Sequence, residues 1–313
     1  MEEVKHQPVM PKEVLAYLNP QPGEVIVDGT IGLGGHAQLI ATRLGPTGVL
    51  IGIDQDPAAL TIARENLAFF SGKLVLFHDN FENIGSLLLK SFPQGVNGLL
   101  LDLGVSSLQL DRGERGFSYQ QDAPLDMRMN PEQSLSAADV VNTFSREDLT
   151  DIIREYGEER WASRIAQFIV EQRRNKPLVT TGQLVEVIKA AIPAGARRTG
   201  PHPARRTFQA IRIAVNRELD VLTKGLHEGI TALKPGGRIV VISFHSLEDR
   251  IVKKTFRQWA KACHCPPEFP ICQCGGKPEL KILTAHPVLP TTEESQRNPR
   301  SRSAKLRAAS RLV

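Results

Sequence analysis

The sequence predicts an α/β fold, a doubly wound sheet that is interrupted by an inserted all-helical domain. Two observations lead to this prediction. Through the first hundred residues, short apolar runs alternate with longer amphipathic segments, which is typical of βαβ units and a parallel sheet. After Leu103 the strand pattern stops while helical periodicity continues, and the strand pattern resumes only at Arg238.

The first strands and helices follow from the apolar runs and their spacing. Asp56 directly precedes Pro57, a pair typical of a helix start because the carboxylate can cap the first turn and proline has no N–H to lose. We expect strands at Val25–Val27, Val49–Ile53, Leu74–Phe77 and Leu99–Leu103, and helices at His36–Leu44, Pro57–Phe69 and Phe81–Leu89.

The middle of the chain is expected to be helical throughout. One long helix from Thr207 to Leu233 follows it and ends at Pro235-Gly236-Gly237, residues that stop helices. We therefore expect a discontinuous sheet domain of residues 1–108 and 207–313 and an inserted domain of residues 109–206. The remaining elements are expected as helices at Ser134–Phe144, Ser145–Tyr156, Glu158–Arg174 and Thr181–Ile192, and as strands at Arg238–Phe244, Leu280–Thr284 and Lys305–Leu312.

Composition excludes several classes of protein. Of the 313 residues, 41% are hydrophobic and 23% charged, as in an ordinary soluble globular protein. No apolar run reaches the ~18 residues that a membrane span needs. The acidic start of the chain has no apolar stretch typical of a secretory signal. We expect a cytoplasmic protein without a membrane partner.

Positive charge is concentrated in two segments. From Ala196 to Arg217 there are six arginines and no acid, and from Arg297 to Val313 five arginines, one lysine and no acid. This distribution favours a polyanionic partner such as RNA, although a solvated basic loop and tail would have the same composition. The candidate phosphate contacts are Arg197, Arg198, Arg205 and Arg206.

A glycine-rich turn joins the first predicted strand to the first predicted helix, where doubly wound sheets bind their cofactors. Gly32-x-Gly34 fits a dinucleotide fingerprint, and Asp54, at the end of the second strand, could hold a ribose in either kind of cofactor. Asp28 opposes a pyrophosphate and favours the cationic S-adenosylmethionine, unless it only caps the turn. The turn alone does not exclude the alternative that the protein is an NAD(P)-dependent oxidoreductase.

All four cysteines lie within twelve residues, which in a cytoplasmic chain indicates a metal site or a reduced loop rather than disulfides. Their Cys-x-Cys spacing is tighter than the usual Cys-x₂-Cys of zinc sites, and the presence of a metal stays open. The four residues are Cys263, Cys265, Cys272 and Cys274.

Several longer motifs together resemble one family. They include Asp28–His36, Leu101–Ser107, Glu114–Ser118, Pro124–Met129, Tyr156–Arg160, Arg206–Ala210, Ile242–Arg250 and Asn298–Ser303. These motifs are similar to those of the RsmH (MraW) family and occur in the same order over almost the whole chain. The resemblance implies a class I, Rossmann-like methyltransferase that uses S-adenosylmethionine. It also implies methylation of the N4 amine of cytidine 1402 in 16S rRNA, within the small ribosomal subunit.

The resemblance also implies which residues form the site. Asp102, near the methionine end of the cofactor, is the expected catalytic residue, and no proton acceptor is singled out. Direct attack by N4 needs no cysteine nucleophile. A non-catalytic RNA-binding assembly factor that retains the fold is the other alternative. The implied cofactor contacts are Gly34, Gly35, His36, Asp54, Phe81, Asp102 and Gln109.

Overall fold

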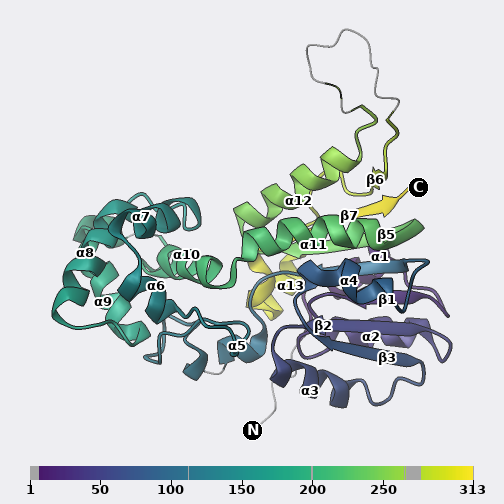
Figure 1. The fold of residues 1–313 in the computed structure, drawn as a ribbon, viewed down its shortest axis with the longest axis horizontal. Helices are drawn as coiled ribbons and strands as arrows, with labels where there is room; N and C mark the ends of the chain where they lie inside the picture. Colours follow the sequence, from purple (N-terminus) through teal and green to yellow (C-terminus); the bar gives the residue numbers. More distant parts are fainter. Residues whose placement is uncertain (1–6, 112, 199, 264, 266–275, 313) are drawn as a thin grey trace. The chain divides into compact units, whose positions relative to one another are not determined.

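The computed structural model describes residues 7–111, 113–198, 200–263, 265 and 276–312 (Figure 1). The chain forms two compact units: unit 1 comprises Met1–Gly104 and Leu219–Val313, and unit 2 comprises Val105–Glu218. The two boundaries follow residues 104 and 218, whereas the sequence placed them after residues 108 and 206. The helix that starts near residue 206 therefore belongs to unit 2.

Unit 1 is built on a seven-stranded sheet with the order β3-β2-β1-β4-β5-β7-β6. Strands β1 to β5 pair in parallel, and β7 runs antiparallel to both of its neighbours. The predicted doubly wound α/β fold is confirmed. The strands are β1 (Val25–Asp28), β2 (Val49–Asp54), β3 (Lys73–His78), β4 (Val96–Asp102), β5 (Leu233–Ser243), β6 (Leu280–Ile282) and β7 (Lys305–Arg311).

Each face of this sheet is covered by its own helices. Neighbouring residues of one strand point to opposite faces, so Ile26 joins one hydrophobic core and Val27 the other. The first core includes α1 (Pro11–Leu18), α2 (Gly35–Leu44) and α3 (Pro57–Asn66); the second includes α4 (Ile84–Leu89), α11 (Glu218–Ala232) and α12 (Ser246–Trp259). The short helix α13 (Thr292–Arg297) precedes β7.

The prediction of a single long helix from Thr207 to Leu233 is wrong. The segment forms α10 (Arg205–Asn216) and α11, separated by Arg217 in the left-handed conformation with φ 51°. That conformation ends α10 without the glycine or proline that would mark a break in the sequence. The helix end expected at Pro235-Gly236-Gly237 is also wrong, because these residues lie within β5, where the pairing with β4 shifts in register between Val96 and Gly98.

Unit 2 is helical within the described residues. Its core combines the apolar faces of all its longer helices and includes Leu149, Ile165, Ile188 and Ile211, each fully buried. The side chains of Ser136 and Thr180 cap two of the helices, each in a reciprocal capping box. The helices are α5 (Ser107–Asp111), α6 (Ala137–Thr143), α7 (Arg146–Glu155), α8 (Ala162–Asn175), α9 (Thr181–Ala191) and α10.

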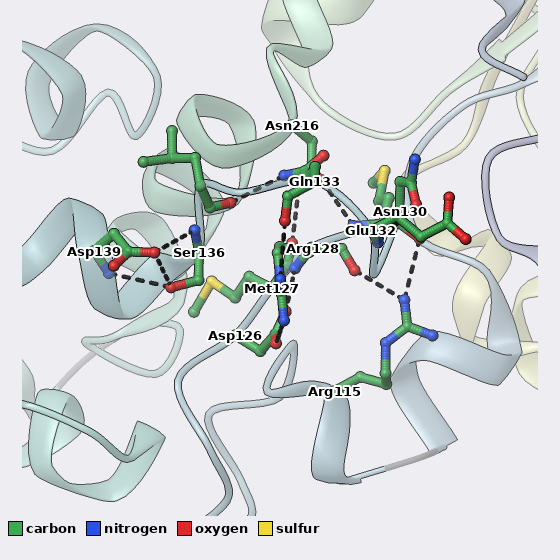
Figure 2. Close-up of polar contacts among 12 residues, drawn as sticks. Arg115, Asp126, Met127, Arg128, Asn130, Glu132, Gln133, Ser136, Asp139 and Asn216 are labelled. Atoms are coloured by element: carbon green, nitrogen blue, oxygen red, sulfur yellow. Dashed lines mark hydrogen bonds and ion pairs between the residues drawn. The ribbon is translucent and has the colours of Figure 1, made fainter.

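A polar network fixes the motif at Pro124–Met129 inside unit 2 (Figure 2). Asp126 forms a bidentate ion pair with Arg128, whose Nη2 lies 2.6 Å from Oδ2. The buried Asn216 accepts the Met129 N–H at 2.8 Å and donates to the Met127 carbonyl at 2.8 Å. Met127 has φ 58°, so these bonds hold a strained loop in one conformation. The polar side chains of this motif therefore have a structural role within unit 2.

Candidate active site

The glycine-rich turn leaves β1 at its carboxyl end and leads into α2. Gly32 and Gly34 have φ 50° and 85°, a region that side chains with a Cβ rarely adopt. Gly34 is the N-cap of α2, which has no side-chain cap and no acid in its first turn. The predicted glycine-rich turn between strand and helix is present, and the N-terminus of α2 carries no side-chain cap.

Asp54 ends β2, next to β1 in the sheet, and its carboxylate fixes the turn. Oδ2 accepts the N–H of Gly32 at 2.8 Å, and Oδ1 accepts the N–H of Asp56 at 2.9 Å. Burial raises the pKa of Asp54 to about 6, although these hydrogen bonds act in the opposite direction. Asp54 thus has a role that the sequence did not indicate, because it sets the path of the turn as well as being a candidate ribose ligand.

Phe81 opens a short 3₁₀ helix, η1 (Phe81–Asn83), that follows β3. Two glycines make room for it. A methyl group on Gly225, in the middle of α11, would overlap the ring and lie 2.6 Å from Cε2. A methyl group on Gly29 would overlap Leu101, at 2.6 Å from its Cδ2, and would lie 3.3 Å from the Phe81 Cβ. Since Ala is a better helix former than Gly by about 1 kcal/mol, the contact with Phe81 explains why α11 has a glycine there.

Asp102 ends β4 and lies beside His36, from the first turn of α2. The Nε2 atom of His36 is 3.5 Å from Oδ2 of Asp102, and His36 is 6% exposed. Both ring nitrogens of His36 and Oδ1 of Asp102 are buried without a hydrogen-bond partner among the described residues. Buried polar atoms are almost always paired, so three unpaired atoms at one place indicate a site that fits a polar ligand.

Asp28 lies at the end of β1 and is 1% exposed. Its Oδ1 accepts the Thr30 N–H at 3.2 Å, so the capping role that the sequence left open is present. Burial raises the pKa of Asp28 to about 7, against the opposing influence of His36. A buried carboxyl that titrates near neutral pH can still stabilise a cationic ligand, and the two roles are compatible.

Thr30 connects the turn to the candidate catalytic strand. Its Oγ1 accepts the N–H of Asp102 at 2.7 Å. Neither this bond nor the fit of Gly225 against Phe81 was expected from the sequence. The only signal for Gly225 was a glycine inside a predicted helix, and nothing in the sequence indicated its partner.

Gln109 and the candidate phosphate-binding arginines lie in unit 2. Gln109 is buried on α5, and its Oε1 accepts the Ser106 N–H at 3.0 Å. The four arginines 197, 198, 205 and 206 are exposed and lie in or near η3 (Ala194–Arg197) and α10. Cys272 and Cys274 lie outside the described residues, so the question of a metal there stays open.

The structure joins Gly34, His36, Asp54, Phe81 and Asp102 at one carboxyl edge of the unit 1 sheet. A family model described as "MraW methylase family" matches residues 3–312. The chain belongs to the MraW methylase family. Membership of the MraW methylase family confirms the predicted enzyme class, a methyltransferase.

Relatives of this MraW methylase family chain match it over nearly their full length. Two are named ribosomal RNA small subunit methyltransferase H: one from Geobacter sulfurreducens is 57% identical, over 98% of this chain and 99% of its own. The other, from Geotalea daltonii, is 56% identical over 100% of both chains. A solved rRNA methylase from Streptococcus thermophilus aligns with a TM-score of 0.43 at 10% identity, over 99% of each chain. Among the described residues, no helix has the length and apolar character required to cross a membrane.

Proposed function

We propose that this chain methylates the N4 amine of cytidine 1402 in the 16S rRNA of the small ribosomal subunit, with S-adenosylmethionine as methyl donor. The observation that carries the proposal is the cluster of unpaired buried atoms at His36 and Asp102, next to the glycine-rich turn. The names of the full-length relatives support rRNA as the substrate class.

The site fits S-adenosylmethionine in its charges. That cofactor supplies an electrophilic methyl group on a sulfonium. Asp28 and Asp102 place two carboxyl groups at the ends of neighbouring strands β1 and β4, where they can stabilise positive charge. A pyrophosphate at the same turn would face these carboxylates, and this opposes the alternative of an NAD(P)-dependent oxidoreductase.

The remaining contacts are assigned by their chemistry. Gly34 and Gly35 are the proposed backbone contacts at the start of α2, Asp54 can accept hydrogen bonds from the ribose hydroxyls, and Phe81 offers a ring to the adenine. Gln109, on α5, remains a proposed cofactor contact. These assignments rest on the resemblance together with the placement of each residue.

The proposed reaction is direct displacement. The N4 nitrogen of cytosine attacks the methyl carbon, the bond from that carbon to sulfur breaks, and the amine releases one proton to solvent. The N4 lone pair is conjugated with the ring and is a weak nucleophile. Asp102 would therefore act by accepting a hydrogen bond from the amino group and holding the nitrogen in line with the methyl–sulfur bond. No covalent enzyme adduct is needed, so we expect each single Cys→Ser variant, at Cys263, Cys265, Cys272 or Cys274, to retain methylation within a few-fold.

Unit 2 is the proposed rRNA-contacting part of the chain. Its exposed arginines 197, 198, 205 and 206 can bind phosphates, which supply affinity and position rather than sequence choice. Shape recognition of the folded rRNA is the mode that such contacts favour.

The decisive experiment is to map labelled methyl groups on small-subunit rRNA treated with the purified chain. We expect one labelled position, at N4 of cytidine 1402, and none when that cytidine is replaced by uridine. A label on another base or atom would contradict the target. No label at all, with S-adenosylmethionine bound, would instead favour the non-catalytic assembly factor.

A further inference from the structure

One pair of rings in unit 2 lies outside everything assigned above. The imidazole of His202 stacks on the ring of Tyr119, with centroids 4.7 Å apart and planes inclined by 9°. Tyr119 in turn meets Phe208 edge-on, at 5.8 Å between centroids and 83° between planes. Phe208 is only 3% exposed, so the stack is anchored in the core of unit 2.

His202 is held in a fixed orientation at the surface. Its Nδ1 accepts the Ala204 N–H at 3.3 Å, and its carbonyl accepts the Arg205 N–H at 3.0 Å, directly before α10. The residue is nevertheless exposed. One face of the imidazole therefore covers Tyr119, while the ring is still accessible to solvent.

The chain around His202 is rich in arginine. Arg205 is exposed three residues after His202, and Arg197 and Arg198 are exposed five and four residues before it. Partial burial of the ring and the nearby charge of Lys189 lower the pKa of His202, which favours the neutral imidazole. Lys189 itself pairs with Glu186 at 2.8 Å. A neutral flat ring among arginines matches the chemistry of an unpaired nucleobase with its flanking phosphates.

We propose that the stacked pair of Tyr119 and His202 is a platform on which one unpaired base of the substrate RNA stacks. This inference rests on the proposed function for the identity of the RNA. It adds a contact of another kind, because the arginines act on phosphates through charge, whereas His202 acts on a base through its face. A paired base cannot use the platform, since both its faces are covered by its neighbours in the duplex.

The test distinguishes base stacking from phosphate contacts in two ways: by the salt dependence of binding, and by comparing single-stranded with duplex RNA. The full chain is titrated, without methyl donor, with a short uridine-rich single-stranded RNA and with the same strand in a duplex, at several salt concentrations. We expect His202→Ala to weaken single-strand binding about five- to tenfold, at the lower end of the range for base stacking on aromatic side chains. The slope of log affinity against log salt stays the same, because no phosphate contact is lost.

Two variants make the comparison specific. His202→Phe keeps a flat ring and is expected to restore single-strand binding to within about twofold of the unmodified chain. His286→Ala removes another exposed histidine, also followed by proline but in unit 1, and is expected to change nothing. Unchanged single-strand binding in His202→Ala, an equal loss with duplex RNA, or no rescue by phenylalanine would each overturn the proposal.

A photochemical readout tests the contact itself. RNA carrying 5-iodouridine is expected to crosslink to Tyr119 or His202, and a crosslink map without either residue would contradict the platform. Both measurements are independent of catalysis. If cytidine 1402 is not methylated but these binding and crosslinking results hold, the proposed function fails and the platform stands. If cytidine 1402 is methylated but these results fail, the proposed function stands and the platform fails.

Discussion

Nε2 of His36 lies 3.5 Å from Oδ2 of Asp102; His36 comes from α2, which follows the glycine-rich turn, and Asp102 from β4, which pairs with β1. Neither ring nitrogen of His36 has another hydrogen-bond partner among the described residues. The pair therefore leaves polar capacity unused in the folded chain, which is expected of a site that is completed by its ligand.

Asp102→Ala is expected to remove most of the methylation while the chain stays folded. The backbone N–H of Asp102 bonds to Thr30, and this contact survives the loss of the side chain. Single-turnover methyl transfer should fall by about 10²-fold or more, as when a group that positions the reacting atoms is lost. Circular dichroism serves as the folding control, and a folded variant of near-normal rate would exclude Asp102 from the chemistry.

The pH dependence of cofactor binding should follow Asp28. Burial raises its pKa to about 7, and only the ionised carboxylate attracts a cation, so S-adenosylmethionine should bind more tightly as the pH rises through that value. Isothermal titration calorimetry across this range measures the change. Asp28→Asn should bind more weakly and lose most of the dependence; a variant that retains the whole dependence would assign it to another group.

Asp28 also affects the free energy of unfolding. Its carboxyl titrates at 3.8 in the unfolded chain and at about 7 in the folded chain, so between these values the folded state binds more protons. The free energy of unfolding should therefore fall as the pH rises through this window. Denaturant titrations of Asp28→Asn should show a shallower fall, with the contribution of Asp54, whose pKa is about 6, still present.

Gly225→Ala should weaken S-adenosylmethionine binding, because the added methyl group overlaps the Phe81 ring and displaces it. We expect a loss of about 1 kcal/mol or more, comparable to losing a stacked aromatic contact. A double-mutant cycle separates this effect from helix stability: in a Phe81→Ala background, Gly225→Ala should cost little further affinity. Equal losses in the two backgrounds would show that Gly225 does not act through Phe81.

Replacing the four arginines 197, 198, 205 and 206 by glutamine should weaken rRNA binding and flatten its salt dependence. Each lost phosphate contact reduces the slope of log affinity against log salt by about 0.7–0.9. Cofactor binding should not change. Arg43→Gln combined with Arg64→Gln removes exposed charge from unit 1 and is the matched control. The same slope in the fourfold variant and the unmodified chain would place these arginines away from the RNA.

Asn216→Ala should destabilise unit 2 by about 2–3 kcal/mol, because it leaves the Met129 N–H and the Met127 carbonyl without their buried partner. Asn130→Ala removes a comparable side chain that only caps an exposed turn through the Glu132 N–H, and it should cost less than about 0.5 kcal/mol. Thermal unfolding of the two variants gives the comparison. Equal stability would mean that the loop holds its conformation without Asn216.

The sequence predicted features that depend on local pattern. The apolar runs located the strands, and Asp56 caps α3 through the Ala58 N–H as expected. Arg217 gave no such signal, because arginine is not one of the residue types that mark a left-handed helix end. The contact of Gly225 with Phe81 was equally hidden, since it joins residues far apart in the chain. Local chemistry is therefore visible in a sequence, whereas contacts made by packing are not.

The order of strands in unit 1 has a consequence for synthesis. Strands β4 and β5 are neighbours in the sheet, yet all of unit 2 is made between them. At a synthesis rate of about 5–20 residues per second, the edge of β4 waits on the order of ten seconds for its partner. During that time it offers unpaired N–H and C=O groups to any other strand. If unit 2 folds before β5 is made, the loop between β4 and β5 becomes shorter, and the entropy cost of pairing these two strands falls. The insertion therefore makes the order in which parts of the chain fold a condition for a productive sheet.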